Sequence, residues 1–142
     1  MTHTLRIKVR GYHCDFYGHV NNARYLEFLE EARWGFLEDG LDLAEWKARG
    51  LGFVVTEVTI KYRRPAGLNA VLEVRTRTGS LGPRGGVILQ DVVLVESGEL
   101  AASAQITFAV IDLARGKAVP LDGEIAETLG RSLPPADGKD AS

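Results

Sequence analysis

The chain has 142 residues, of which 45% are hydrophobic and 25% charged, and its formal net charge is −2 at pH 7. These values indicate one globular domain with a single core. With so small a net charge, no strong electrostatic field for nucleic acid or for an anionic membrane is expected.

The sequence also points to a compartment. Its single cysteine, Cys14, allows neither an internal disulfide nor a metal site built from cysteines. The N-terminal residues lack the apolar stretch of a signal peptide, and no apolar run approaches the about 18 residues of a membrane span. We therefore expect a cytoplasmic protein without a membrane span.

The first predicted elements are a strand and a long helix. Residues 5–10 alternate apolar and basic side chains, which predicts a strand with one apolar face. Apolar residues then recur at helical spacing and predict a helix over about residues 22–39. Asn21 or Asn22 can cap its start, and Gly40 can end it in a left-handed conformation.

The second half of the chain is predicted to form strands. A shorter helix comes first, with Asp42 and Glu45 at the spacing of a capping box and Gly50 at its end. Four strands are then expected, separated by turn residues, at 54–62, 72–77, 87–96 and 100–110. In the first of these strands, the even-numbered residues from Val54 to Tyr62 are expected to share one face throughout.

This order of elements predicts the fold class. Consecutive strands joined mainly by short turns indicate an antiparallel sheet, so the class is α+β, with the long helix packed on one face. Residues 131–142 are rich in Pro, Ala, Asp, Gly and Ser. This composition predicts a flexible C-terminal tail after a domain that spans residues 1–130.

The polar stretch before the long helix carries the candidate chemistry. A helix N-terminus offers unpaired N–H groups and a partial positive charge, which polarise a carbonyl oxygen and stabilise an oxyanion. A nearby carboxylate such as Asp15 can act as a nucleophile or as a general base. This combination suits acyl transfer; the alternative is that Asp15 and Asn22 are only turn and cap residues.

The same stretch resembles a known family. The run D-x-x-G-H-V-N-N-x-x-Y, from Asp15 to Tyr25, is similar to that of the 4-hydroxybenzoyl-CoA thioesterase family of hotdog-fold proteins. Residues 62–66 (Y-R-R-P-A) resemble the family's strand-end segment, and residues 103–112 resemble its closing strand. A Gly-Asp pair that is common in the family is replaced by Leu68-Asn69, which leaves the turn there open.

The resemblance implies a fold and a reaction. The fold is the hotdog fold, a five-stranded antiparallel sheet wrapped around the long helix, in a homodimer or homotetramer with active sites at the subunit interface. The reaction is hydrolysis of an acyl-CoA thioester to a carboxylic acid and CoA, without metal or other cofactor. Asp15 matches the family's catalytic carboxylate, as nucleophile or general base, and a backbone N–H near Asn22 matches the donor that polarises the thioester carbonyl.

Other candidate site residues have two interpretations each. His19 either moves a proton and holds substrate or fixes its loop through a backbone contact. Asn22 either positions water or caps the helix. Tyr17 is expected to contact substrate. Arg63 and Arg64 either bind the phosphates of CoA, for which arginine forks are suited, or form a solvated strand end.

Two alternative functions stay open at this point. The acyl group can arrive on an acyl-carrier protein instead of CoA, or the domain can bind acyl-CoA without turnover. Glu30 and Glu31 on the long helix are further candidate carboxylates, although a solvated or ion-paired role is the expectation for both.

Overall fold

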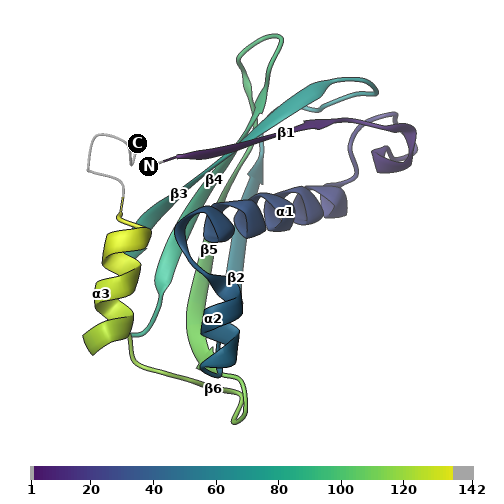
Figure 1. Ribbon diagram of the computed structural model, residues 1–142. Coiled ribbons are helices and arrows are strands. Elements are labelled where there is room, and N and C mark those ends of the chain that lie inside the picture. Colours follow the sequence, from purple (N-terminus) through teal and green to yellow (C-terminus); the bar gives the residue numbers. More distant parts are fainter. Residues whose placement is uncertain (1, 136–142) are drawn as a thin grey trace.

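The computed structural model describes residues 2–135 and shows one antiparallel sheet that curves around a long helix (Figure 1). The strands are β1 (His3–Lys8), β2 (Leu51–Tyr62), β3 (Val71–Leu81), β4 (Gly86–Leu94), β5 (Leu100–Asp112) and β6 (Lys117–Ala118). They lie in the order β1-β3-β4-β5-β2, and β6 pairs with β5. The helices are α1 (Asn22–Gly40), α2 (Leu43–Ala48), α3 (Gly123–Ser132) and the 3-10 turn η1 (Gly11–His13). The predicted α+β class and the five-stranded hotdog sheet are confirmed.

Helix α1 has the extent that its hydrophobic spacing predicts. The apolar residues at helical spacing are all buried: Tyr25, Phe28, Leu29, Ala32, Phe36 and Leu37. Asn21 caps the helix, because its Oδ1 accepts a hydrogen bond from the Ala23 N–H at 2.9 Å. Asn22 is the first helical residue. Of the two expected caps, Asn21 is therefore right and Asn22 is wrong.

The end of α1 differs from the prediction. Gly40 is still helical, and the Leu41 N–H bonds to the Leu37 carbonyl at 2.8 Å. A Cβ at Gly40 would lie 2.7 Å from Leu133 Cδ2, so the close approach of the segment after α3 explains the glycine. Gly50, in contrast, has a φ of +80° and follows α2 as predicted.

Strand β2 contains a break that its sequence pattern does not show. The register with β5 shifts between Val55 and Glu57, which leaves Thr56 as the extra residue of a β-bulge. Because paired residues share a face, Val55 and Val58 both lie on the face of buried Phe108 and Ile106. The expected single alternation from Val54 to Tyr62 is therefore wrong before the bulge and right after it.

The C-terminal segment is more ordered than its composition predicts. Helix α3 continues through Arg131 and Ser132, and Leu129 and Leu133 are buried. Figure 1 shows α3 beside the sheet, and its C-terminal end, at Ser132 and Leu133, lies close to Gly40 at the end of α1. The expected boundary at residue 130 thus falls inside a helix, because apolar side chains at helical spacing find a place in the core. The rest of the expected tail, residues 136–142, lies outside the described residues.

Candidate active site

The polar stretch before α1 folds as a small hairpin. Cys14 and Val20 form an antiparallel bridge, and the Asp15 N–H donates to the His19 carbonyl at 2.8 Å. At the tip, the Gly18 N–H bonds to the Asp15 carbonyl at 3.0 Å, and Gly18 has a φ of +78° that favours glycine. This turn brings Asp15 back beside His19, three residues before α1 begins.

Backbone amides hold the carboxylate of Asp15. Its Oδ1 accepts hydrogen bonds from the Tyr17 N–H at 2.9 Å and, more weakly, from the His19 N–H at 3.4 Å. Within residues 2–135, Oδ2 has no hydrogen-bond partner, and the side chain is exposed. One carboxylate oxygen is therefore fixed, and the other is free to react.

The first turn of α1 supplies a donor. The Ala23 N–H donates to the side chain of the cap residue Asn21, and the Arg24 N–H donates to the Asn21 carbonyl at 2.9 Å. The N–H of Asn22 precedes the helical ladder and has no partner among the described residues. The Asn22 carbonyl accepts a hydrogen bond from the Tyr62 hydroxyl at 3.0 Å, which ties the helix start to the end of β2.

His13 anchors the hairpin, a role that the sequence did not reveal. Its Nδ1 accepts the Arg10 N–H at 2.9 Å, and its ring packs edge-on against Phe28 with centroids 4.9 Å apart. Its carbonyl accepts the Asn21 N–H at 2.9 Å. Burial, with the nearby charge of Arg24, lowers the pKa of His13 below its usual 6.5, so the neutral ring that accepts this bond is favoured.

The other predicted residues of the hairpin are exposed. The His19 side chain has no hydrogen-bond partner in the described part of the chain, although its backbone pairs with Asp15 and bridges to Gly67. Tyr17 is 78% exposed, and the neighbouring Phe16 is 94% exposed. Exposed aromatic side chains next to a carboxylate are typical of a contact or ligand-binding surface.

A largely apolar groove opens between α1 and the first half of β2. Its volume is about 300 Å³. Trp34 and Leu37 line it from the helix, and Phe53 and Val55 line it from the strand. Glu30 and Arg33 contribute its polar groups, and the burial of Arg33 lowers the pKa of its guanidinium. We refer to it below as the α1–β2 groove.

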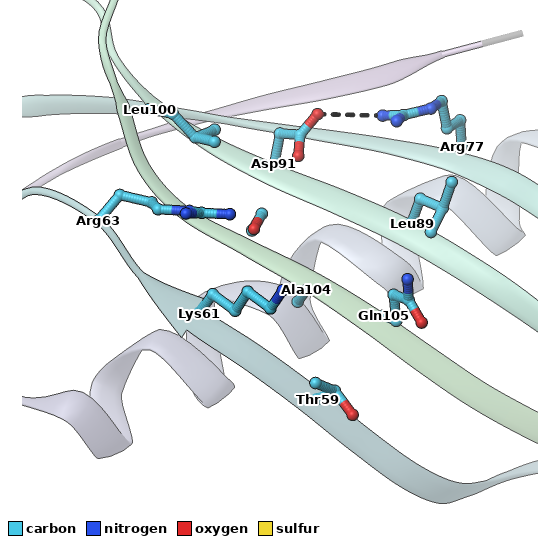
Figure 2. A pocket seen from close by; sticks show the side chains of 10 residues that line it. Thr59, Lys61, Arg63, Arg77, Leu89, Asp91, Leu100, Ala104 and Gln105 are labelled. Atoms are coloured by element: carbon cyan, nitrogen blue, oxygen red, sulfur yellow. Dashed lines mark hydrogen bonds and ion pairs between the residues drawn. The ribbon is translucent and has the colours of Figure 1, made fainter. Parts of the chain in front are cut away.

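The two candidate phosphate-binding arginines point to different places. Arg64 forms an ion pair with Glu99, with Nε and Oε2 3.0 Å apart. Arg63 lines a pocket of about 440 Å³ on the outer face of the sheet, with α1 behind the strands (Figure 2). This outer pocket is formed by Thr59, Lys61, Arg63, Arg77, Leu89, Asp91, Leu100, Ser103, Ala104 and Gln105. The structure therefore places neither arginine on the hairpin that carries Asp15.

Metal ligands and membrane segments were also sought. In residues 2–135, no three His, Cys, Asp or Glu side chains are grouped so that they could hold a metal ion. None of the described helices combines the length and apolar character needed to cross a membrane.

The curved sheet around one long helix, with a carboxylate held next to the helix start, defines a hotdog domain of the thioesterase class. Residues 9–129 match the model of the Thioesterase-like superfamily, and the chain belongs to this superfamily. The predicted thioesterase class is thus confirmed, whereas the 4-hydroxybenzoyl-CoA label is only approximate.

Relatives and solved structures agree with this placement. The long-chain acyl-CoA thioesterase FadM of Escherichia coli is 49% identical over 125 residues, covering 87% of this chain and 94% of FadM. The crystal structure of YbaW, a probable thioesterase of Escherichia coli, superposes with a TM-score of 0.86 at 45% identity, covering 92% of this chain and 98% of YbaW. A probable thioesterase of Bartonella henselae gives a TM-score of 0.71 at 30% identity, covering 85% and 98%.

Proposed function

We propose that this acyl-CoA thioesterase hydrolyses long-chain acyl-CoA, with Asp15 as the catalytic carboxylate. The 49% identity to the long-chain acyl-CoA thioesterase FadM supports the substrate class. The observation that carries the proposal is the carboxylate of Asp15, which two backbone amides orient in a hairpin directly before a helix whose first N–H is unpaired. The expected cytoplasmic location belongs to the same proposal.

The chemistry follows from these groups. The thioester carbonyl oxygen accepts the Asn22 N–H, and the partial positive charge of the helix start stabilises the oxyanion that forms on attack. Oδ2 of Asp15 either attacks the carbonyl carbon or removes a proton from an attacking water. The carbon–sulfur bond then breaks and releases the CoA thiolate, which becomes the thiol by taking a proton from the Asp15 carboxyl in the general-base route or from water in the nucleophilic route. In the general-base route the attacking water supplies the new oxygen of the fatty acid directly. In the nucleophilic route an acyl-aspartyl anhydride forms, and a water molecule must hydrolyse it to release the fatty acid and restore the Asp15 carboxylate.

A second copy of the chain is part of the proposal. Strand β2 is an edge of the described sheet, and Val54, Val55 and Val58 on it are 38–40% exposed. An unpaired edge with apolar side chains is a template for pairing with another strand. Two β2 strands in antiparallel register would join the sheets of two subunits about a two-fold axis. We infer a homodimer formed in this way.

The dimer would complete the active site. Tyr62, at the end of β2, contacts the start of α1, whereas Phe53 and Val55, near the beginning of β2, line the α1–β2 groove. Antiparallel pairing puts the end of one strand beside the beginning of the other. The Asp15 hairpin of one subunit would therefore lie near the groove of its partner, which can accommodate the acyl chain and cover Phe16 and Tyr17.

Release of free CoA thiol from saturated acyl-CoAs of increasing length tests the proposal. We expect the highest kcat/KM for long chains, and we expect Asp15→Asn to lower kcat by about 100-fold or more. Asp39→Asn, the same change near the other end of α1, is the matched control and should retain activity. Near-normal turnover by Asp15→Asn would refute its catalytic role. Activity only on acyl-carrier-protein esters, or binding without turnover, would refute the substrate assignment.

A further inference from the structure

The outer pocket is built by the order of side chains on three strands. Ser103 of β5 lies in register between Lys61 of β2 and Asp91 of β4. Paired residues in a sheet share a face, so these three side chains all stand on the outer face, away from α1. The short serine forms a floor, and the longer side chains on both sides form walls. Figure 2 shows Lys61 and Arg63 from one wall directed across β5.

The pocket has uncompensated positive charge. In the described part of the chain, Asp91 is the only acidic side chain that lines it, and Asp91 is paired with Arg77, with Oδ2 and Nη1 3.1 Å apart. Among residues 2–135, Lys61 and Arg63 have no ion-pair partner, whereas the neighbouring Arg64 is bound to Glu99. Two cations thus face a hollow whose single carboxylate is already neutralised.

An ordinary solvated sheet face does not account for this arrangement. The outer face of an antiparallel sheet is usually polar, so charged residues there are expected. Here the free cations converge on a hollow of about 440 Å³, next to the Ser103 hydroxyl and the Gln105 amide. Pairing of β2 edges in a dimer would use the strand's backbone and would leave this face open. Stacking two such faces together would bring like charges into contact, which disfavours a second subunit as the occupant.

We propose that the outer pocket binds the phosphate groups of a small molecule. A phosphate between Lys61 and Arg63 would accept charge-assisted hydrogen bonds from both, and Ser103 can donate a further one from the floor. The phosphates have two possible sources, which are CoA itself or a separate phosphorylated metabolite such as a nucleotide. The site is distinct from the Asp15 hairpin and the α1–β2 groove. With CoA as the ligand it extends the substrate site and rests on the proposed function, whereas with a separate metabolite it goes beyond that function.

Calorimetric titration of the full chain with inorganic pyrophosphate, without any thioester, tests the proposal. We expect saturable binding that weakens by about tenfold or more in the double variant Lys61→Gln/Arg63→Gln, since two charged hydrogen bonds are lost. Arg64→Gln removes an adjacent but already paired charge and should bind like the wild type. Absence of saturable binding, or equal losses in the double variant and in Arg64→Gln, would overturn the proposal.

Titration with CoA and with ADP then separates the two sources. If CoA binding weakens together with pyrophosphate binding in the double variant, the pocket holds the phosphates of CoA. If CoA binding is unchanged while ADP and pyrophosphate binding are lost, the ligand is a separate metabolite. Analytical sedimentation tests whether a second subunit, instead of a phosphate, occupies the pocket. The proposal would be overturned if the wild type binds no pyrophosphate but forms a larger assembly that the double variant does not form. The pocket would then be a contact between subunits. None of these measurements depends on catalysis by Asp15.

Discussion

The side-chain amide of Gln90, in the middle of β4, accepts a hydrogen bond from Arg33 of α1 at 3.1 Å. The same amide donates from Nε2 to the Leu29 carbonyl and to the Thr76 hydroxyl, both at 3.0 Å. Gln90 and Thr76 are completely buried. The amide therefore has partners for both of its ends and links the helix to two strands, which fixes where α1 lies on the sheet.

Replacement of Gln90 tests this link. Gln90→Leu fills a similar volume but leaves Arg33 and Thr76 without their partner, so we expect a loss of about 1–3 kcal/mol in the free energy of unfolding. Urea denaturation measures it. Gln105→Leu makes the same change on the exposed outer face and should cost much less. Equal effects of the two substitutions would show that the buried network contributes nothing specific.

His19 ranks below Asp15 in the proposed mechanism. Its side chain is exposed and has no hydrogen-bond partner within residues 2–135, and its contacts with Asp15 run through the backbone. His19→Ala keeps those backbone contacts, so we expect a smaller fall in kcat than the about 100-fold fall for Asp15→Asn. Steady-state hydrolysis of one acyl-CoA by both variants decides the order. A larger effect of His19→Ala would assign the imidazole a direct part in the reaction.

The cap of α1 can be assigned by stability. Asn21→Ala removes the acceptor of the Ala23 N–H and should destabilise the protein by about 1 kcal/mol. Asn22→Ala, one residue further on, leaves that bond intact and replaces asparagine with a better helix former. Its unfolding midpoint should therefore be unchanged or higher. The reverse order of the two midpoints would place the cap at Asn22.

His13 should make stability depend on pH. Burial, Arg24 and Arg10 lower its pKa in the folded protein below 6.5, with Glu27 opposing them. Below about pH 6.5 the unfolded chain thus binds a proton that the folded protein does not, so stability falls as pH drops towards the folded pKa. Above pH 6.5 this contribution is constant.

The measurement is a comparison of the wild type with His13→Gln. Urea unfolding midpoints at about pH 7.5 and about pH 5.5 should fall more steeply for the wild type than for the variant. Wild type and variant have the same carboxylates, so the contribution of these groups to the pH dependence of stability cancels in the comparison. Parallel slopes would mean that the hydrogen bond between His13 Nδ1 and the Arg10 N–H does not resist protonation of the ring.

The proposed dimer depends on the edge formed by β2. Val58 lies on the inner face of this strand, and Val58→Lys places a charge where the edges would meet, a substitution typical of strands that avoid pairing. We expect a monomer with little activity. Thr59→Lys puts the same charge on the outer face and should stay dimeric. Sedimentation and CoA release together give the answer, and an active monomer of Val58→Lys would refute the shared site.

Elements with strong periodicity were predictable from the sequence. Tyr25, Phe28 and Leu29 lie at helical spacing, and the segment is long enough for this spacing alone to predict a helix. The bulge at Thr56 was not predictable from the sequence. Apolar residues both precede and follow the inserted residue along the strand, so only the pairing with β5 shows the shift in register. Helix α3 had a readable signal in Ile125, Leu129 and Leu133, which the polar composition of the following residues obscured.

The candidate site was predictable only in part. Asp15 and the helix start are neighbours in sequence, so local rules place them together. The α1–β2 groove is lined by residues more than ten positions apart, so it could be recognised only once the fold was known. Arg63 and Arg64 follow a strand, where successive side chains point to opposite sides, and their different partners come from other strands.

The contact between Gly40 and Leu133 packs the residues after α3 against the C-terminal end of α1, the helix whose start lies beside Asp15. Leu133 is 1% exposed and rests where any larger residue at position 40 would have a side chain. Shortening the protein at residue 130, as its composition would suggest, would uncover the far end of α1. A fusion partner or affinity tag attached at residue 130 would compete with Leu133 for the space beside Gly40. A truncation point, a fusion partner or a tag should therefore come after residue 133.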